Sequence, residues 1–275
     1  MHSWSLVTFT LLTQSAVGLV WTLGASHWTD PQNSPICAWG FLLALLLCGV
    51  GLAAALGHLG TPRQAPHAVR NFRQSWLSRE VVSVGAFTAT VALLVYLSMA
   101  RSQPFHRLGM VEAACGVLGL LALYTMVRVY RVRTVPMWNS LATPLEFFGS
   151  ALILGGLLGA MIVGRTAADP TMGPMIRLFL LGGLTCKLAA LGPSRKARRL
   201  SAERSWYEDP PAAGSAIADF FRIGLVLVGV VLAFLATSGF PGGRLTGLAT
   251  ALMLCLAAEC WGRWRFFREY RRVGL

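Results

Sequence analysis

Charge is scarce in this sequence: only 13% of its 275 residues are Asp, Glu, Lys or Arg, whereas an ordinary soluble domain has about 25%. Hydrophobic residues make up 55% and lie in long runs. This composition excludes a soluble enzyme built around one core, and it excludes a disordered chain. Long apolar runs with few charges belong in a bilayer, where about 20 apolar residues cross the hydrocarbon layer.

Sequence features that hold redox cofactors are also missing. The six cysteines form no CxxC pair, although an iron–sulfur cubane needs four thiolates. The histidines lie at the ends of apolar runs or between them, whereas a membrane haem needs axial ligands inside the helices. There is no P-loop, HExxH or nucleophile elbow in a usable context. We therefore predict no haem, iron–sulfur cluster or metal site in this chain.

Eight apolar runs are each long enough to cross a membrane. We place them near residues 4–25, 36–57, 80–100, 108–128, 144–164, 173–191, 216–238 and 241–261. Backbone groups in lipid must be hydrogen-bonded internally, so these runs must be helices. They also lack the alternation typical of a membrane β-barrel. The prediction is an all-α integral membrane protein whose single domain, residues 1–275, is a bundle of eight transmembrane helices.

Basic residues gather on one side of the predicted membrane. With eight spans both termini lie on the same side, which we call side A; the opposite side is side B. Loops and termini on side A carry 17 Arg and Lys residues, whereas side B has five. The positive-inside rule predicts that side A and both termini are cytoplasmic. This topology explains the net charge of +13, so we expect no nucleic-acid partner.

His58 and Glu80 are the best candidates for chemistry, because His58 closes the second span and Glu80 opens the third, both on side A. Ionisable residues at such positions are costly and are functional candidates by default. A quinol loses two protons with its two electrons. Histidine titrates near neutral pH, and a partly desolvated carboxylate takes up a proton readily. The structural alternative is that His58 caps a helix and Glu80, beside Arg79, complements a helix dipole.

Other charged or polar residues near the span ends are weaker candidates. Arg128 and Tyr130 crowd the side A boundary and are expected to line a quinone headgroup. Glu112 lies near side B, and Glu146 opens the fifth span on side A.

Two pairs of opposite charges occur at helical spacing. Asp219 and Arg222 are three residues apart, and Glu259 and Arg263 are four apart. Residues at these spacings are neighbours on one helix, so each pair predicts a local ion pair. Lys187, like Arg222, lies just inside a span near side A.

Two stretches carry a resemblance to a known family. The first is GHLGTP, residues 57–62, followed by a Ser-Arg-Glu helix start at 78–80; the second is MVRVYRVRTVPMWNSLATPLEFF, residues 126–148. Both resemble the membrane anchor subunit of dimethyl sulfoxide reductase, the DmsC type. Eight helices and a length near 275 also fit, so the resemblance spans most of the chain, although the final third matches only in hydropathy.

The resemblance implies a role and a site. In that family the anchor binds quinol and passes its electrons to an iron–sulfur subunit of the four-cluster ferredoxin type, which feeds a molybdopterin catalytic subunit. The family's histidine and glutamate fall on His58 and Glu80 by motif. The candidate quinone-binding residues are thus His58, Gly60, Pro62, Arg73, Glu80, Arg128 and Tyr130. The expected cofactor is menaquinone or ubiquinone, and both partner subunits are expected to dock on side A.

The direction of electron flow stays open. In dimethyl sulfoxide reductases with exported catalytic subunits, the quinol-site face is expected on the periplasmic side, but here that face carries the basic excess. Relatives with a cytoplasmic catalytic pair run electrons to quinone, as in membrane-bound sulfite dehydrogenase. Both functions remain candidates, beside a purely structural anchor and a small transporter. Transporters favour broken helices with polar sites near the midplane, whereas the charges here lie at span ends.

Overall fold

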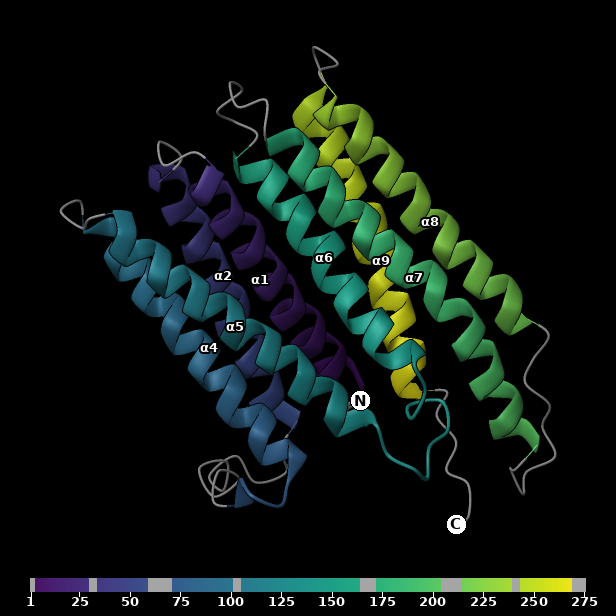
Figure 1. Cartoon of the computed structure of the whole chain (residues 1–275). Helices are drawn as coiled ribbons and strands as arrows, with labels where there is room; N and C mark the ends of the chain where they lie inside the picture. The colour runs from purple at the N-terminus through teal and green to yellow at the C-terminus, as the bar shows by residue number, and fades with distance from the viewer. Residues whose placement is uncertain are drawn as a thin grey trace.

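A computed structural model describes residues 3–29, 34–58, 71–100, 105–163, 172–203, 214–238 and 243–268. Within these ranges eight long helices run side by side (Figure 1). They are α1 (Ser3–Thr29), α2 (Ser34–His58), α4 (Trp76–Met99), α5 (Phe105–Tyr130), α6 (Ala142–Val163), α7 (Met172–Glu203), α8 (Gly214–Thr237) and α9 (Arg244–Arg268). Each is long and apolar enough to cross a membrane. The prediction of an all-α protein with eight membrane-spanning helices is confirmed.

Side chains fix the start of α4 and the end of α9, which differ from the predicted spans. α4 begins at Trp76 rather than near residue 80, because the Ser75 hydroxyl accepts a hydrogen bond from the backbone N–H of Ser78 at 3.4 Å. Such a cap satisfies a donor that the first helical turn leaves open. α9 continues beyond residue 261 to Arg268, because its last turns pack aromatic rings around Tyr130.

α7 is also longer than predicted, continuing from the expected end near residue 191 to Glu203. Pro193 lies inside the helix, where it removes one backbone donor. The turns that follow are tied to α8, because Arg198 donates two hydrogen bonds to Asp219. At about 1.5 Å per residue this helix is about 48 Å long, so it projects beyond a hydrocarbon layer of about 30 Å.

The bundle consists of two four-helix units with the same pattern of neighbours. In the first, α1 packs against α2 and α5, and α4 packs against α2 and α5. In the second, α6 packs against α7 and α9, and α8 packs against α7 and α9. Each unit has four helices, so both units begin at the same end of the bundle (Figure 1). The correspondence between the two units lies in how their helices pack.

The two units meet where α1 crosses α6, and glycines allow the two backbones to touch. A Cβ atom placed on Gly155 would lie 2.1 Å from the backbone carbon of Gly18, and one on Gly18 would lie 1.8 Å from the carbonyl oxygen of Ala151. One turn further, a Cβ on Gly159 would lie 2.4 Å from the Thr22 side chain. Small residues at four-residue spacing are the usual means of close helix contact in membranes.

Replacing Gly155 with Ala should therefore destabilise the whole bundle, by about 3 kcal/mol, the upper part of the range for overpacked sites. The added methyl group meets backbone, which cannot rotate away as a side chain can. The midpoint of thermal unfolding of the purified chain in detergent measures the effect. Gly224→Ala in α8 is the matched control, since nothing lies within 4 Å of its added Cβ. Equal midpoints for the two variants would contradict the proposed close contact.

Candidate functional site

Glu80 lies in the second turn of α4 at the side A end of the bundle, and its side chain is only 4% exposed. Its Oε1 has no hydrogen-bond partner among the described residues, and none of the described cations forms an ion pair with it. Beside it, Ser83 and Thr125 share a hydrogen bond of 2.6 Å that joins α4 to α5. Glu80 is thus a buried carboxyl group with no neutralising partner in the described part of the chain.

The expected partner of Glu80 is only partly described. His58 is the last residue of α2, and α2 ends on side A, where α4 begins (Figure 1). The His58 side chain, and Gly60 and Pro62, lie outside the described residues. Contact between His58 and Glu80 therefore stays a prediction.

Tyr130, another predicted site residue, ends α5 in a closed aromatic environment. It is 7% exposed and interacts electrostatically with both Glu80 and Arg263. Four aromatic rings from the segment after α5, from α6 and from α9 lie with their centres 5.3 to 5.7 Å from its ring: Trp138, Phe147, Phe266 and Phe267. Tyr130 therefore links the first four-helix unit, which holds Glu80, to the second.

Two predicted arginines lie nearer the surface. Arg128 places its guanidinium 4.4 Å from the ring centre of Trp76, one turn before Glu80 on α4. Arg79 lies 4.2 Å from the same ring and donates a hydrogen bond to the carbonyl oxygen of Arg73. Arg73 itself is exposed. Glu80, Arg128 and Tyr130 thus gather around one end of α4 and α5, whereas Arg73 lies at the rim.

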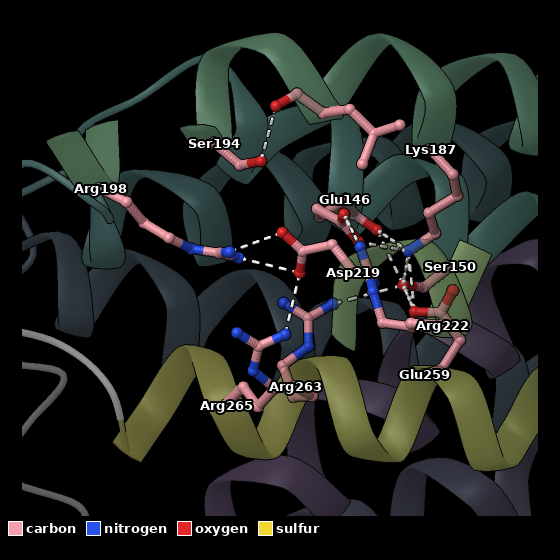
Figure 2. Close-up of polar contacts among 11 residues, drawn as sticks. Glu146, Ser150, Lys187, Ser194, Arg198, Asp219, Arg222, Glu259, Arg263 and Arg265 are labelled. Carbon is pink, nitrogen blue, oxygen red and sulfur yellow. Dashed lines mark hydrogen bonds and ion pairs between the residues drawn. The ribbon is translucent and has the colours of Figure 1, made fainter. Parts of the chain in front are cut away.

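The structure also contains a network of buried charges that the sequence analysis did not predict (Figure 2). At its centre the Lys187 ammonium on α7 is fully buried. It donates to the Glu146 carboxylate at 2.8 Å and to the Glu259 carboxylate at 2.7 Å, and it also contacts Ser150 Oγ at 2.9 Å. These residues come from α6, α7 and α9, so one lysine ties three helices together.

The predicted pairing of Asp219 with Arg222 is wrong. Arg222 binds Glu146 of α6 through both terminal nitrogens. Asp219 accepts hydrogen bonds from Arg198 of α7 and from Arg265 of α9. The reason is that neighbouring helices present opposite charges at the same depth. Ion pairs between helices therefore neutralise the carboxylates of both Glu146 and Asp219. Contacts in which an arginine binds a carboxylate through two nitrogens are also favourable.

The predicted pairing of Glu259 with Arg263 is also wrong. Glu259 binds Lys187 and Ser150. Arg263 instead donates to Gln14 of α1 at 2.9 Å, and its guanidinium lies 3.8 Å from the ring centre of Phe147. A cation that lies over an aromatic face is attracted by the negative charge of that face. Arg263 thereby connects the network to α1 and the first four-helix unit.

A signal for this network was present in the sequence. Four successive spans, the fifth to the eighth, each carry a charged residue near the side A end, and Lys187 is one of only two lysines. Charges inside spans normally pair with one another, so their alternating signs favour pairing between helices.

The network differs from the Glu80 site because its carboxylates are paired with cations. Glu146, Asp219 and Glu259 each have at least one cationic partner, and four cations among the described residues form these ion pairs. A cavity of about 70 Å³ beside them is lined by Arg222 and Glu259, among others. Because its carboxylates are paired with cations from other helices, this network is suited to fixing helices in place. Glu80 has no such partner in the described part of the chain and is better suited to gain or lose a proton.

A buried histidine–glutamate pair, separate from the network, lies at the opposite end of the bundle. His27 Nδ1 lies 2.9 Å from Glu112 Oε2, and both side chains are buried between α1 and α5. His27 had been expected beyond the end of the first span, but α1 extends past it to Thr29. Glu112 lies near side B, as predicted. In the described parts of the chain, no group of three or more His, Cys, Asp or Glu side chains is arranged to hold a metal ion.

The sequence matches the family profile of the DMSO reductase anchor subunit (DmsC) over residues 1–268. The chain belongs to this family. It is 27% identical to the anaerobic dimethyl sulfoxide reductase chain YnfH of Escherichia coli (strain K12) over 280 residues, covering 100% of this chain and 97% of that protein. A second E. coli relative, itself named as part of the anaerobic dimethyl sulfoxide reductase, is also 27% identical, over 286 residues, with the same coverage.

Another relative of this DmsC-family protein has a different name. A sulfite dehydrogenase subunit of Allochromatium vinosum is 28% identical over 228 residues, covering 73% of this chain and 68% of that protein. No solved structure matches this chain. The family and the eight apolar helices together identify a multi-pass membrane protein.

Proposed function

We propose that this chain anchors a molybdopterin and iron–sulfur oxidoreductase in the bacterial inner membrane and exchanges electrons with the quinone pool at side A. The observation that carries the proposal is Glu80, a buried carboxyl group without a cation or a hydrogen bond to its Oε1 in the described part of the chain. A group that gives or takes a proton at the membrane boundary fits this environment.

The residues of the site have distinct tasks in this proposal. Quinone, menaquinone or ubiquinone, supplies the two-electron chemistry when bound. Glu80 accepts a proton from quinol, or donates one in the reverse direction. His58 hydrogen-bonds to a quinone oxygen. Gly60, Pro62, Arg73, Arg128 and Tyr130 line the headgroup site. Of these, Arg128 and Tyr130 are supported by their position around Glu80.

The partners are inferred from the family. A four-cluster, ferredoxin-like iron–sulfur subunit would carry electrons between side A and a molybdopterin catalytic subunit. We propose that it docks on side A, because electron transfer needs its terminal cluster close to the quinone at Glu80. The anchor does not itself contact the sulfur substrate in this arrangement.

Orientation favours sulfite oxidation. Three of the basic residues on side A, Arg198, Arg263 and Arg265, belong to the buried network. The other fourteen still outnumber the five on side B, which supports a cytoplasmic side A and cytoplasmic termini. The iron–sulfur and catalytic subunits, if they dock there, would face the cytoplasm, as expected for a quinone-reducing sulfite dehydrogenase. Similarity over the whole chain to two dimethyl sulfoxide reductase proteins favours the second candidate, a quinol-oxidising dimethyl sulfoxide reductase.

The complex purified with its native partners tests these assignments when it is assayed in both directions. We expect sulfite oxidation coupled to the reduction of quinone. A reporter that is active only in the periplasm should be inactive when it is fused after Leu275. Dimethyl sulfoxide reduction with quinol and an active reporter would support the second candidate and overturn the orientation. Solute uptake by the chain alone in liposomes would identify a transporter instead. Quinone-coupled activity that survives substitution of both His58 and Glu80 would identify a purely structural anchor.

A further inference from the structure

A groove of about 540 Å³ lies at the side A end of the second four-helix unit, away from Glu80. One wall is the segment that joins α5 to α6, residues 131–141, and the other is the last part of α7, residues 192–200. It lies apart from the charged network, because none of the residues that pair in that network lines it.

The depth of the groove matches the headgroup layer of a membrane. Pro193 is 21 residues beyond the start of α7 at Met172, which corresponds to about 32 Å along the helix axis. A hydrocarbon layer is about 30 Å thick. The groove therefore begins where the acyl chains end and extends into the zone of lipid phosphates.

The lining is divided into polar and apolar parts. Arg133, Lys196, Asn139 and Ser140 supply two cations and neutral hydrogen-bonding groups, and no Asp or Glu belongs to the lining. Leu141, 63% exposed, supplies an apolar surface. An anionic group attached to an apolar chain would complement both parts.

The two cations of the groove are available to a ligand. Both Arg133 and Lys196 are exposed, and neither forms an ion pair with a described residue. Two other basic residues of α7 are engaged within the protein, because Arg198 binds Asp219 and Arg195 lies over the ring of Phe220. Among the described residues, therefore, no carboxylate neutralises the charge that faces the groove.

We propose that this groove binds the headgroup of an anionic phospholipid, with the phosphate between Arg133 and Lys196 and an acyl chain against Leu141. Basic pockets at the membrane surface recognise such headgroups through their charge. The bound lipid would join the α5–α6 connection to α7 and so stabilise the side A end of the second unit. The proposal does not depend on quinone chemistry at Glu80.

Native mass spectrometry of the full-length protein, purified in detergent and supplied with phosphatidylglycerol or phosphatidylcholine, tests the proposal. Each basic residue near an anionic lipid surface contributes about a fivefold gain in binding. The double variant Arg133→Gln, Lys196→Gln should therefore retain phosphatidylglycerol about 30-fold more weakly than the natural protein. Phosphatidylglycerol should also raise the thermal midpoint of the natural protein but not that of the variant.

The matched control removes the same charge from the same two segments. Arg131→Gln with Arg199→Gln changes two exposed arginines outside the lining, and retention should fall less than about fivefold. Equal losses in both double variants would mean diffuse attraction and would overturn the site, as would equal retention of phosphatidylcholine. Loss of the lipid when the partner subunits assemble would also overturn the proposal, because it would assign the groove to a protein interface.

Discussion

Replacing Glu80 with Gln should lower quinone-coupled turnover of the assembled complex about 100-fold or more, the usual range for a lost acid–base group. Glutamine keeps the shape and polarity of the side chain but cannot exchange a proton. The Glu80 carboxyl group forms no ion pair with the described residues, so the substitution removes no such pair and should leave the fold intact. Turnover with quinone or quinol, compared with turnover with an artificial dye that reacts with the catalytic subunit, measures the effect.

The matched control is Glu112→Gln, which changes a second buried carboxyl group at the opposite end of the same four-helix unit. It should leave quinone-coupled turnover within about threefold of the natural protein, because side B has no part in the proposed reaction. Loss of dye activity in the Glu80 variant would point to failed assembly rather than to proton transfer. Unchanged quinone-coupled turnover in a fully assembled variant would remove Glu80 from the site.

Replacing Lys187 with Met should destabilise the protein by about 3–5 kcal/mol, the cost of breaking a buried ion pair by removing one partner. Glu146 would still be paired with Arg222, but Glu259 would lose its only ion-pair partner among the described residues. The Glu259 carboxylate would remain buried, at 1% exposure, and its negative charge would be uncompensated. The midpoint of thermal unfolding in detergent and the amount of protein recovered from membranes measure the loss.

A second substitution separates the charge effect from a packing effect. Adding Glu259→Gln to Lys187→Met removes the stranded carboxylate and should recover at least half of the lost stability. No recovery in the double variant would mean that the methionine side chain itself disrupts the contact between α6, α7 and α9. The quinone-coupled turnover of complexes that do assemble should be nearly unchanged, since the network is assigned a structural role.

Hydropathy alone predicts most of the fold, because crossing a membrane is a local requirement on each segment. The eight spans were predicted at nearly correct positions, and the errors fall where side chains outside the run decide the end. α7 passes Pro193 because Arg198 is bound by Asp219, and α9 reaches Arg268 because its last rings surround Tyr130. Neither contact can be inferred from the mean hydropathy of a local stretch of sequence.

The candidate site was predictable only in part. Glu80 stands out in the sequence because it is a carboxyl group at the start of an apolar run. Its burial, with no cation paired to it among the described residues, strengthens its candidacy. Tyr130 was singled out by its position near the boundary, but its role as the link between the two units required the arrangement of α5, α6 and α9. The contact of His58 with Glu80 is still a prediction.

By itself, the sequence determined the number of spans, the family and the side A location of Glu80, because hydropathy, motifs and span ends are read along the chain. Only the tertiary structure decided which charges pair. Residues three or four apart on one helix are always neighbours, which is why Asp219 with Arg222, and Glu259 with Arg263, were expected to pair. In a bundle the adjacent faces of other helices offer closer partners, and a buried charge binds the partner that best replaces water.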